Sequence, residues 1–407
     1  MTGRKRRALP AVLLVVALAT VGCSPDEYVA PPPAQGSEVA DPATAANTLA
    51  SLQDAVVAGD AAAAGDLATD DARPLLESLA ANAQAIDLTD VTFRYVTETG
   101  RTSGTDGWDG LVAVTWRIEG FDEASARAEI PLSFADGGRQ IAAIGDQSGR
   151  LPVWLTGPVT VERVPGGLVL VSDSTSGAPA DRTSYARWVR KAVAEARAVV
   201  GGRTGLVVEV PRDAAALHRA LGADPGSYGS IAAVTAPVDG SRVTGSPIHV
   251  FVNPAVYDDL DPVAAQVVMT HEAVHALTGA VLARNVPLWL VEGFADYVAL
   301  RDVGLPLSKT AGQIRAQVRK NGVPKALPED AEFNPAGTHL GAVYEAAWQV
   351  TVTLAERRGE RALVDFYRAM LAGKKIAPTL RAAFDWSVAD LTTAWQAQLA
   401  ALAGVPE

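Results

Sequence analysis

The sequence predicts an α+β protein: a small helix-plus-curved-sheet domain, then a domain with a mixed sheet and a helical C-terminal half. Three observations lead to this prediction. An Ala-rich helical segment precedes strand-like runs within residues 43–150. Strand-like and helical runs then alternate, and nearly every segment after residue 260 has a helical pattern. We therefore expect one domain at 43–150 and a second at 151–407.

Residues 1–22 have the pattern of a secretory signal. Basic residues at positions 4–7 precede the apolar stretch ALPAVLLVVALATV, which is short for a membrane-spanning helix of about 20 residues. Cys23, the only cysteine, follows directly, and the ending VGC resembles the lipobox of bacterial lipoproteins. Thr20 departs from that pattern, in which a larger aliphatic residue is more usual. The alternative is an ordinary cleaved signal with an incidental cysteine.

The lipobox resemblance implies an extracytoplasmic protein that is attached to the cell membrane by lipid on Cys23. Residues 23–42, which are Pro-rich and polar, are then expected to form an extended tether. A single cysteine excludes an internal disulfide. The formal net charge is −11, and removing residues 1–22, with their four basic and no acidic residues, makes it −15. That charge argues against nucleic acid as a partner.

The domain at 43–150 begins with a helical pattern that runs to about residue 86. The strand-like runs VTFRYV, LVAVTWRI, ARAEIPLSF and RQIAAI follow, with turn clusters between them. A helical segment followed by such a meander resembles, faintly, the nuclear-transport-factor-like modules found beside enzymes in exported proteins. We see no catalytic constellation here and expect its scattered carboxylates to form a solvated face.

The second domain opens with a predicted hairpin, PVTVERV and LVLVSD, joined by a Gly-rich turn. A helical pattern from about 183 to 200, the strand-like run GLVVEV and a short helix at about 213–221 come next. Two more strand-like runs, IAAVTAPV and SPIHVFVNP, precede the helical half. We expect His218 on the surface of the short helix and His249 to serve packing rather than chemistry.

The stretch HEAVH lies on a predicted helix that starts at Asp261-Pro262 and stops at Gly279. His271 and His275 are four residues apart, so both rings project from one face of this helix. That spacing is typical of zinc hydrolases, in which two imidazoles bind the metal and the neighbouring carboxylate, here Glu272, accepts a proton from water. The same pattern also arises by chance on apolar core helices. A metal site is therefore indicated only if a further ligand is present.

A third ligand is available on the next predicted helix, in VPLWLVEGFADYVAL. Glu292 follows His275 by 17 residues and can complete a His2Glu site with an open fourth position. Asp296 shares its helix face and can accept the outer ring N–H of a ligand histidine. The alternative is a solvated acidic pair, but the apolar neighbours make a poor place for unpaired charge.

HEAVH followed by WLVEGFADY resembles the gluzincin pattern HExxH…ExxxD, and is especially similar to the peptidase MA-like domains of bacterial exported proteins. The resemblance covers roughly residues 160–400 and implies a zincin-like fold with Zn2+ as cofactor. It implies that His271, His275 and Glu292 are the zinc ligands. It also implies that Glu272 is the general base and that Asp296 orients a ligand histidine.

Gluzincins also supply a Tyr or His that donates to the developing oxyanion, from helices after the third ligand. Tyr344, in HLGAVYEAAWQ, fits that position, with His339 as the rival and packing beside Trp348 as the alternative. Gluzincins bind the substrate main chain by strand addition at the edge strand of the sheet, and SPIHVFVNP is a candidate for that edge strand.

The sequence thus predicts an exported, membrane-anchored zinc metallopeptidase of gluzincin type, with a peptide or protein substrate. The chain lacks the GxMEN motif by which aminopeptidase N-like gluzincins grip a free N-terminus, which favours an endopeptidase. One alternative is a non-catalytic envelope binding or assembly lipoprotein that retains a zinc-site fold. The other is a purely structural helix that carries the motif by chance.

Overall fold

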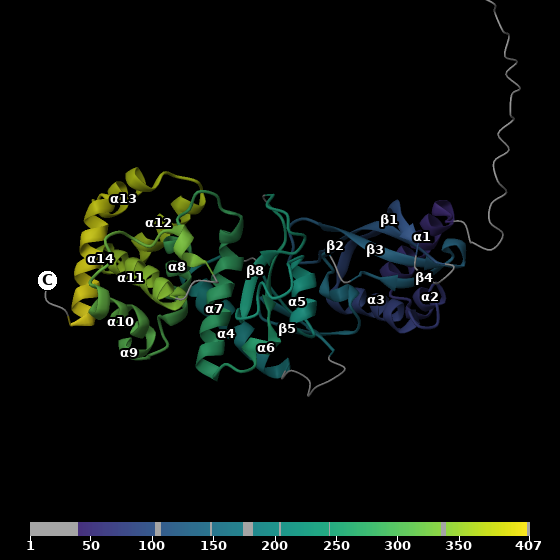
Figure 1. Cartoon of the computed structure of the whole chain (residues 1–407), viewed down its shortest axis with the longest axis horizontal. Helices are drawn as coiled ribbons and strands as arrows, with labels where there is room; N and C mark the ends of the chain where they lie inside the picture. The colour runs from purple at the N-terminus through teal and green to yellow at the C-terminus, as the bar shows by residue number, and fades with distance from the viewer. Residues whose placement is uncertain are drawn as a thin grey trace, which may run out of the picture. The chain divides into compact units, whose positions relative to one another are not determined.

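The computed structural model contains two β-sheets followed by a run of helices (Figure 1). It describes residues 40–101, 107–146, 149–173, 182–202, 205–243, 245–334 and 339–404. The predicted signal segment and Cys23 lie outside these residues. Among the described helices, none is both long and apolar enough to cross a membrane.

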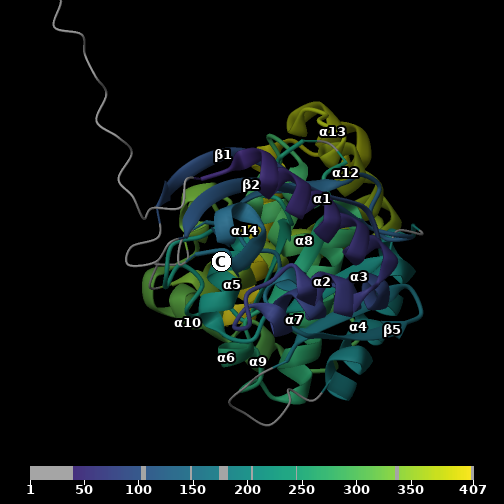
Figure 2. The same cartoon turned by 90° about the vertical axis from the view of Figure 1, so that its right-hand side faces the viewer.

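The first sheet is an antiparallel meander that follows three helices, as predicted. The helices are α1 (Pro42–Ala58), α2 (Ala61–Asp66) and α3 (Arg73–Ile86), and the strands, in sheet order, are β1 (Leu88–Arg101), β2 (Trp108–Ile118), β3 (Ala126–Ala135) and β4 (Gln140–Ile144). Asp41 caps α1 and Pro42 is its first residue, so α1 begins at the last residue of the predicted tether. Register shifts along β1 bend the strand, and β1 packs on α1 (Figure 2).

The second sheet has the order β5-β6-β7-β9-β8. Its strands are β5 (Val159–Val164), β6 (Gly167–Ser172), β7 (Leu206–Val210), β8 (Ala233–Pro237) and β9 (Ile248–Val252). The pairs β6–β7 and β7–β9 are parallel, while β5 and β8 pair antiparallel at the two edges. The prediction that SPIHVFVNP offers the open edge is therefore wrong. After β8 the chain turns back and inserts β9 between β7 and β8, so β8 is the edge strand beside it.

Helices connect the strands of the second sheet and then form the C-terminal half. They are α4 (Arg182–Val200), α5 (Ala214–Leu221), α6 (Pro254–Tyr257), α7 (Pro262–Thr278), α8 (Leu288–Leu300), α9 (Leu307–Thr310), α10 (Gly312–Asn321), α11 (Leu340–Arg358), α12 (Glu360–Leu371), α13 (Ile376–Phe384) and α14 (Val388–Ala403). Short 3₁₀ turns lie at Asp136–Gly138, Val153–Leu155, Ala280–Leu282 and Asp330–Phe333. The α+β prediction, with its mixed sheet and helical C-terminal half, is confirmed.

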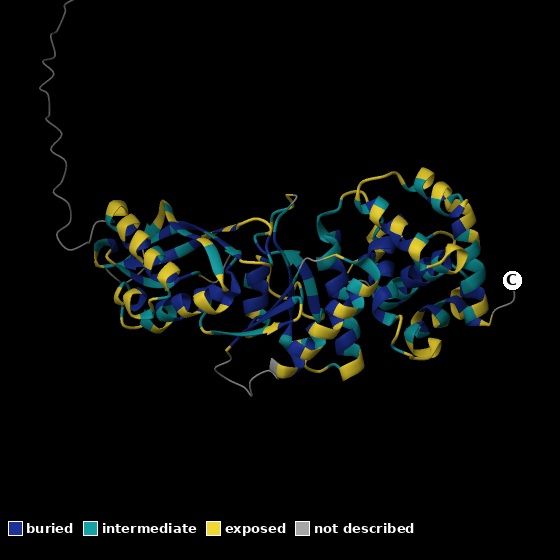
Figure 3. Ribbon diagram, turned by 180° about the vertical axis from the view of Figure 1, so that it is seen from behind, coloured by how far each residue is buried: buried dark blue, intermediate teal, exposed yellow. Residues whose placement is uncertain are grey.

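Two apolar clusters cover the opposite faces of the second sheet. On one face, Val208 and Val250 pack with α4, α7 and the C-terminal helices. On the other, Val207 and Phe251 join the cluster that includes the first sheet and its helices. Figure 3 shows the buried residues in the strands and on the inner faces of the helices. The second sheet is thus buried on both sides, which explains its nearly continuous apolar strands.

His218 on α5 is buried, so its predicted surface position is wrong. The backbone N–H of Tyr228 donates to its Nε2 at 3.4 Å, and the Tyr228 ring lies near the imidazole. The loop after α5 covers this side chain, which helical periodicity alone does not reveal.

Candidate metal centre

Helices α7 and α8 bring the three predicted ligand residues together. His271 and His275 project from one face of α7, and their Nε2 atoms lie 2.9 Å apart. Oε2 of Glu292, on α8, lies 3.2 Å from Nε2 of His271 and 3.3 Å from Nε2 of His275. The ligand atoms of these three side chains are therefore close enough together to bind one metal ion. Among the described residues, no other group of three or more His, Cys, Asp or Glu side chains meets this condition.

The separations of these atoms fit a zinc ion. Ligand atoms about 2.0–2.1 Å from a tetrahedral zinc lie about 3.3 Å from one another, and the observed separations are 2.9, 3.2 and 3.3 Å. Two imidazoles and one carboxylate are also the donor set of catalytic rather than structural zinc sites. The three residues therefore suit a zinc that keeps one position open for water or substrate.

The local sequence explains why α7 holds its histidines firmly. The Asp261 side chain accepts from the backbone N–H groups of Val263 and Ala264, and Gly279 ends the helix in a left-handed conformation. Between these caps, Ala265, Met269, Ala273 and Val274 are fully buried, where α7 packs against the second sheet and α4. The helix starts and stops where the sequence predicted.

Asp296 orients one of the two histidines. Its Oδ1 accepts the Nδ1–H of His271 at 2.8 Å, which leaves the lone pair on Nε2 directed at the other ligand atoms. Asp296 lies one helical turn after Glu292, as the shared face predicted. Nδ1 of His275, by contrast, is buried without a hydrogen-bond partner among the described residues.

The ligand residues and Asp296 strongly affect one another's pKa values. Burial favours a neutral carboxyl, but the imidazoles of His275 and His271 outweigh it and hold the pKa of Glu292 well below its ordinary value. Burial likewise favours neutral His271, but the carboxylates of Asp296 and Glu292 raise its pKa well above the ordinary value. A cation that binds here displaces imidazole protons, so its affinity must fall at low pH.

Tyr344 reaches the site from α11, whereas His339 does not. The Tyr344 ring centroid lies 6.2 Å from that of His271. Burial and the nearby carboxylates raise the pKa of Tyr344 above its ordinary value, so the phenol keeps its proton and can donate. His339 immediately precedes α11 and its side chain is exposed.

Glu272 lies on the flank of α7 that faces the second sheet. Its side chain is buried, and its Oε2 accepts from the hydroxyl of Thr235 on β8 at 2.6 Å. Thr235 could not be singled out from the sequence, since this contact joins residues 37 positions apart on a strand and a helix. The one available signal was a hydroxyl in a strand close to the motif helix.

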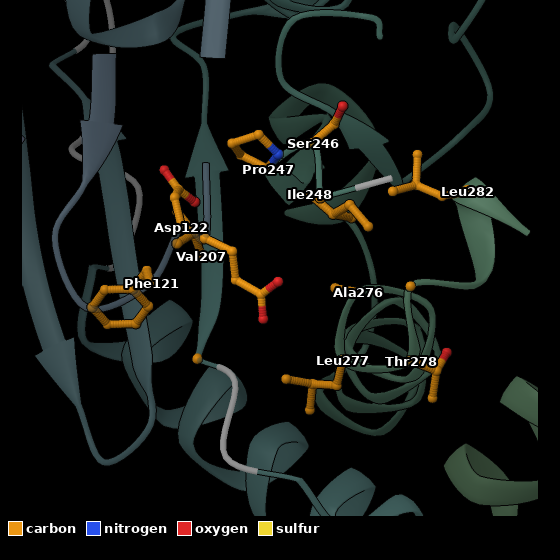
Figure 4. Close-up of a pocket in the computed structure, with 14 residues that line it drawn as sticks. Phe121, Asp122, Val207, Ser246, Pro247, Ile248, Ala276, Leu277, Thr278 and Leu282 are labelled. Carbon is orange, nitrogen blue, oxygen red and sulfur yellow. The ribbon is translucent and has the colours of Figure 1, made fainter. Parts of the chain in front are cut away.

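A pocket of ≈ 240 Å³ lies at the C-terminal end of α7. Figure 4 shows Leu277 and Thr278 on one wall, Phe121 and Asp122 on the opposite wall, and Pro247 between them. The pocket therefore lies between the C-terminal end of α7 and the loop after β2.

Beside this pocket, His249 is fully enclosed between two carboxylates. Its Nδ1 lies 2.6 Å from Glu209 on β7, and its Nε2 lies 3.0 Å from Asp122. Burial would lower the pKa of His249, but Asp122 and Glu209 outweigh it and raise the pKa to about 9. The protonated ring therefore ties β9 to the loop after β2. The residue serves the fold, as predicted, but through buried charge rather than simple packing.

Comparison with known proteins gives only a distant likeness. No family model matches the chain, and no curated protein matches it. Among solved structures, it is similar to an M1 zinc metallopeptidase from Deinococcus radiodurans bound to a Tyr-Ser-Ala substrate, at 12% identity and a TM-score of 0.36. A second structure, titled M1 zinc metallopeptidase from Deinococcus radiodurans, matches at 13% identity and a TM-score of 0.35.

Both alignments cover 78% of this chain and 61% of the matched chain, so this chain spans less than two thirds of those proteins. A likeness at this level transfers neither activity nor substrate. The function must therefore be inferred from the residues of this chain.

Proposed function

We propose that this chain is a zinc-dependent metallopeptidase of the gluzincin type, acting outside the cytoplasm and held at the cell membrane by lipid on Cys23. The observation that carries the proposal is the convergence of His271, His275 and Glu292, with Asp296 behind one ligand. The signal-like segment and the VGC sequence support the location. The missing GxMEN motif supports cleavage within a chain rather than at a free N-terminus.

These three residues would hold the zinc, which supplies a Lewis acid that activates water and polarises the carbonyl of the scissile bond. Glu272 accepts a proton from the attacking water and delivers it to the nitrogen of the departing amine. The hydroxyl of Tyr344 donates a hydrogen bond to the carbonyl oxygen as that atom gains negative charge. The open side of β8 receives the main chain of an extended peptide.

The experiment uses purified protein that lacks residues 1–23, reconstituted with zinc and incubated with a broad peptide library that is read by mass spectrometry. We expect cleavage within peptides. The matched control is Glu272→Gln, which should keep its zinc and lose hydrolysis because the amide cannot accept the proton. Zinc binding without any cleavage would instead favour a non-catalytic envelope lipoprotein. Equal cleavage by Glu272→Gln would refute the assignment of the base.

A further inference from the structure

Thr235 connects the edge strand of the second sheet to the proposed base. Its Oγ1 lies 2.6 Å from Oε2 of Glu272 and 3.1 Å from the main-chain oxygen of the same residue. One hydroxyl proton serves both acceptors, and the shorter, charge-assisted contact to the carboxylate is the stronger. Both side chains are buried, at 7% and 9% exposure, so water competes poorly for this bond.

The strand fixes where this hydroxyl lies. Thr235 sits in the middle of β8 and pairs with Val250 of β9, which in turn pairs with β7. The other side of β8 carries no strand among the described residues. The same residue therefore belongs to the edge that can accept a peptide and holds the carboxylate that would act on it.

The bond leaves the two oxygens of Glu272 unequal. Oε2 is engaged by Thr235, and no other side-chain hydrogen bond to Glu272 is found in the described part of the chain. A carboxylate anchored through one oxygen keeps a single rotamer and presents the other oxygen for proton transfer. Productive proton transfer depends on such orientation, and small misplacements are costly.

We propose that Thr235 is the positioning residue of Glu272: its hydroxyl sets the base in register with a peptide bound along β8. This inference rests on the proposed function for its catalytic consequence. The hydrogen bond itself does not, because it joins two side chains of this chain. Two readouts, one catalytic and one on zinc-free protein, therefore separate the two claims.

The catalytic readout compares Thr235→Val, which keeps the shape and removes the hydroxyl, with Thr235→Ser, which keeps the hydroxyl. We expect Thr235→Val to bind zinc normally, to lower kcat at least about tenfold and to change KM less than about twofold. Thr235→Ser should restore most of kcat. Thr48→Val is the matched control, since Thr48 is equally buried at 7% and its hydroxyl bonds only backbone oxygens, at Thr44 and Gly138. It should leave kcat unchanged.

The second readout is a double-mutant cycle on thermal unfolding of the zinc-free protein. Thr235→Val should lower Tm by about 2–4 °C in the otherwise natural chain, and by less than half of that in a Glu272→Leu background. Equal Tm losses in both backgrounds would overturn the proposal. So would an unchanged kcat in Thr235→Val, a Ser variant as slow as the Val variant, or loss of zinc from either. If the zinc-loaded natural chain cleaves nothing, the proposed function fails, while the cycle still decides the role of Thr235.

Discussion

Replacing Gly293 by alanine should push helices α8 and α11 apart and lower the affinity of the metal centre for zinc. A Cβ at Gly293 would lie 2.3 Å from the carbonyl oxygen of Ala347 and 3.1 Å from the backbone nitrogen of Trp348. Ordinary contact begins at 3.4 Å, so the helices must separate by about 1 Å, because the obstructing atoms are backbone and cannot rotate away. Glu292 is the preceding residue and moves with α8.

We expect two measurable consequences of Gly293→Ala. The added methyl should lower the free energy of unfolding by about 1–3 kcal/mol, the usual cost of overpacking. A carboxylate displaced by about 1 Å from two fixed imidazoles should lower zinc affinity at least about tenfold. Chemical unfolding measures the first, and competition with a chromophoric chelator measures the second.

Gly312→Ala provides the matched control, since a Cβ there meets nothing within 4 Å and Gly312 begins helix α10. It should be neutral or slightly stabilising, as expected for alanine in a helix. If Gly293→Ala behaves like this control in both assays, the close contact between α8 and α11 does not hold Glu292 in place.

Three further changes test separate contacts. Asp296→Asn should lower zinc affinity about 10–100-fold, because a neutral amide orients His271 less strongly; unaltered affinity in chelator competition would contradict this role. Tyr344→Phe should keep zinc but lower kcat about 10²–10³-fold, the usual effect of losing an oxyanion donor; a normal kcat would remove the residue from the mechanism. The pKa of His249 is raised from 6.5 to about 9 by its two flanking carboxylates, so its stabilisation is full below pH 6.5 and lost as pH rises through about 9. The free energy of unfolding should fall by roughly 3 kcal/mol across that range, and His249→Gln should flatten the fall; parallel pH profiles would refute it.

The ligand positions were predictable because they follow from local periodicity. Two residues four apart on a capped helix must share a face, which places His271 beside His275 and Asp296 beside Glu292. The apolar residues around the second pair required that α8 be buried against other helices. The only long-range assumption was that α7 and α8 meet, and their separation by a short connection favoured that.

Apart from His218, which the loop directly after its helix covers, the errors and omissions involve contacts between segments that are distant in the sequence. The order of strands in a sheet depends on which strands pair, and this pairing is not visible in the sequence. It therefore could not be predicted that β9 lies between β7 and β8, or that β8 is the edge strand. The bond between His249 and Asp122 spans 127 positions, and the one between Thr235 and Glu272 spans 37. No local pattern encodes such partners, since each residue type is common in strands, loops and helices alike.

The zinc content of the purified protein decides whether His271, His275 and Glu292 form a metal site. Protein that lacks residues 1–23 is reconstituted with zinc, freed of loosely bound metal and measured by elemental analysis beside a His271→Ala, His275→Ala double variant. We expect about one zinc per chain, and none in the double variant. Two results would contradict the proposed zinc site. One is an unsubstituted protein that holds no zinc after reconstitution, and the other is a double variant that holds as much zinc as the unsubstituted protein.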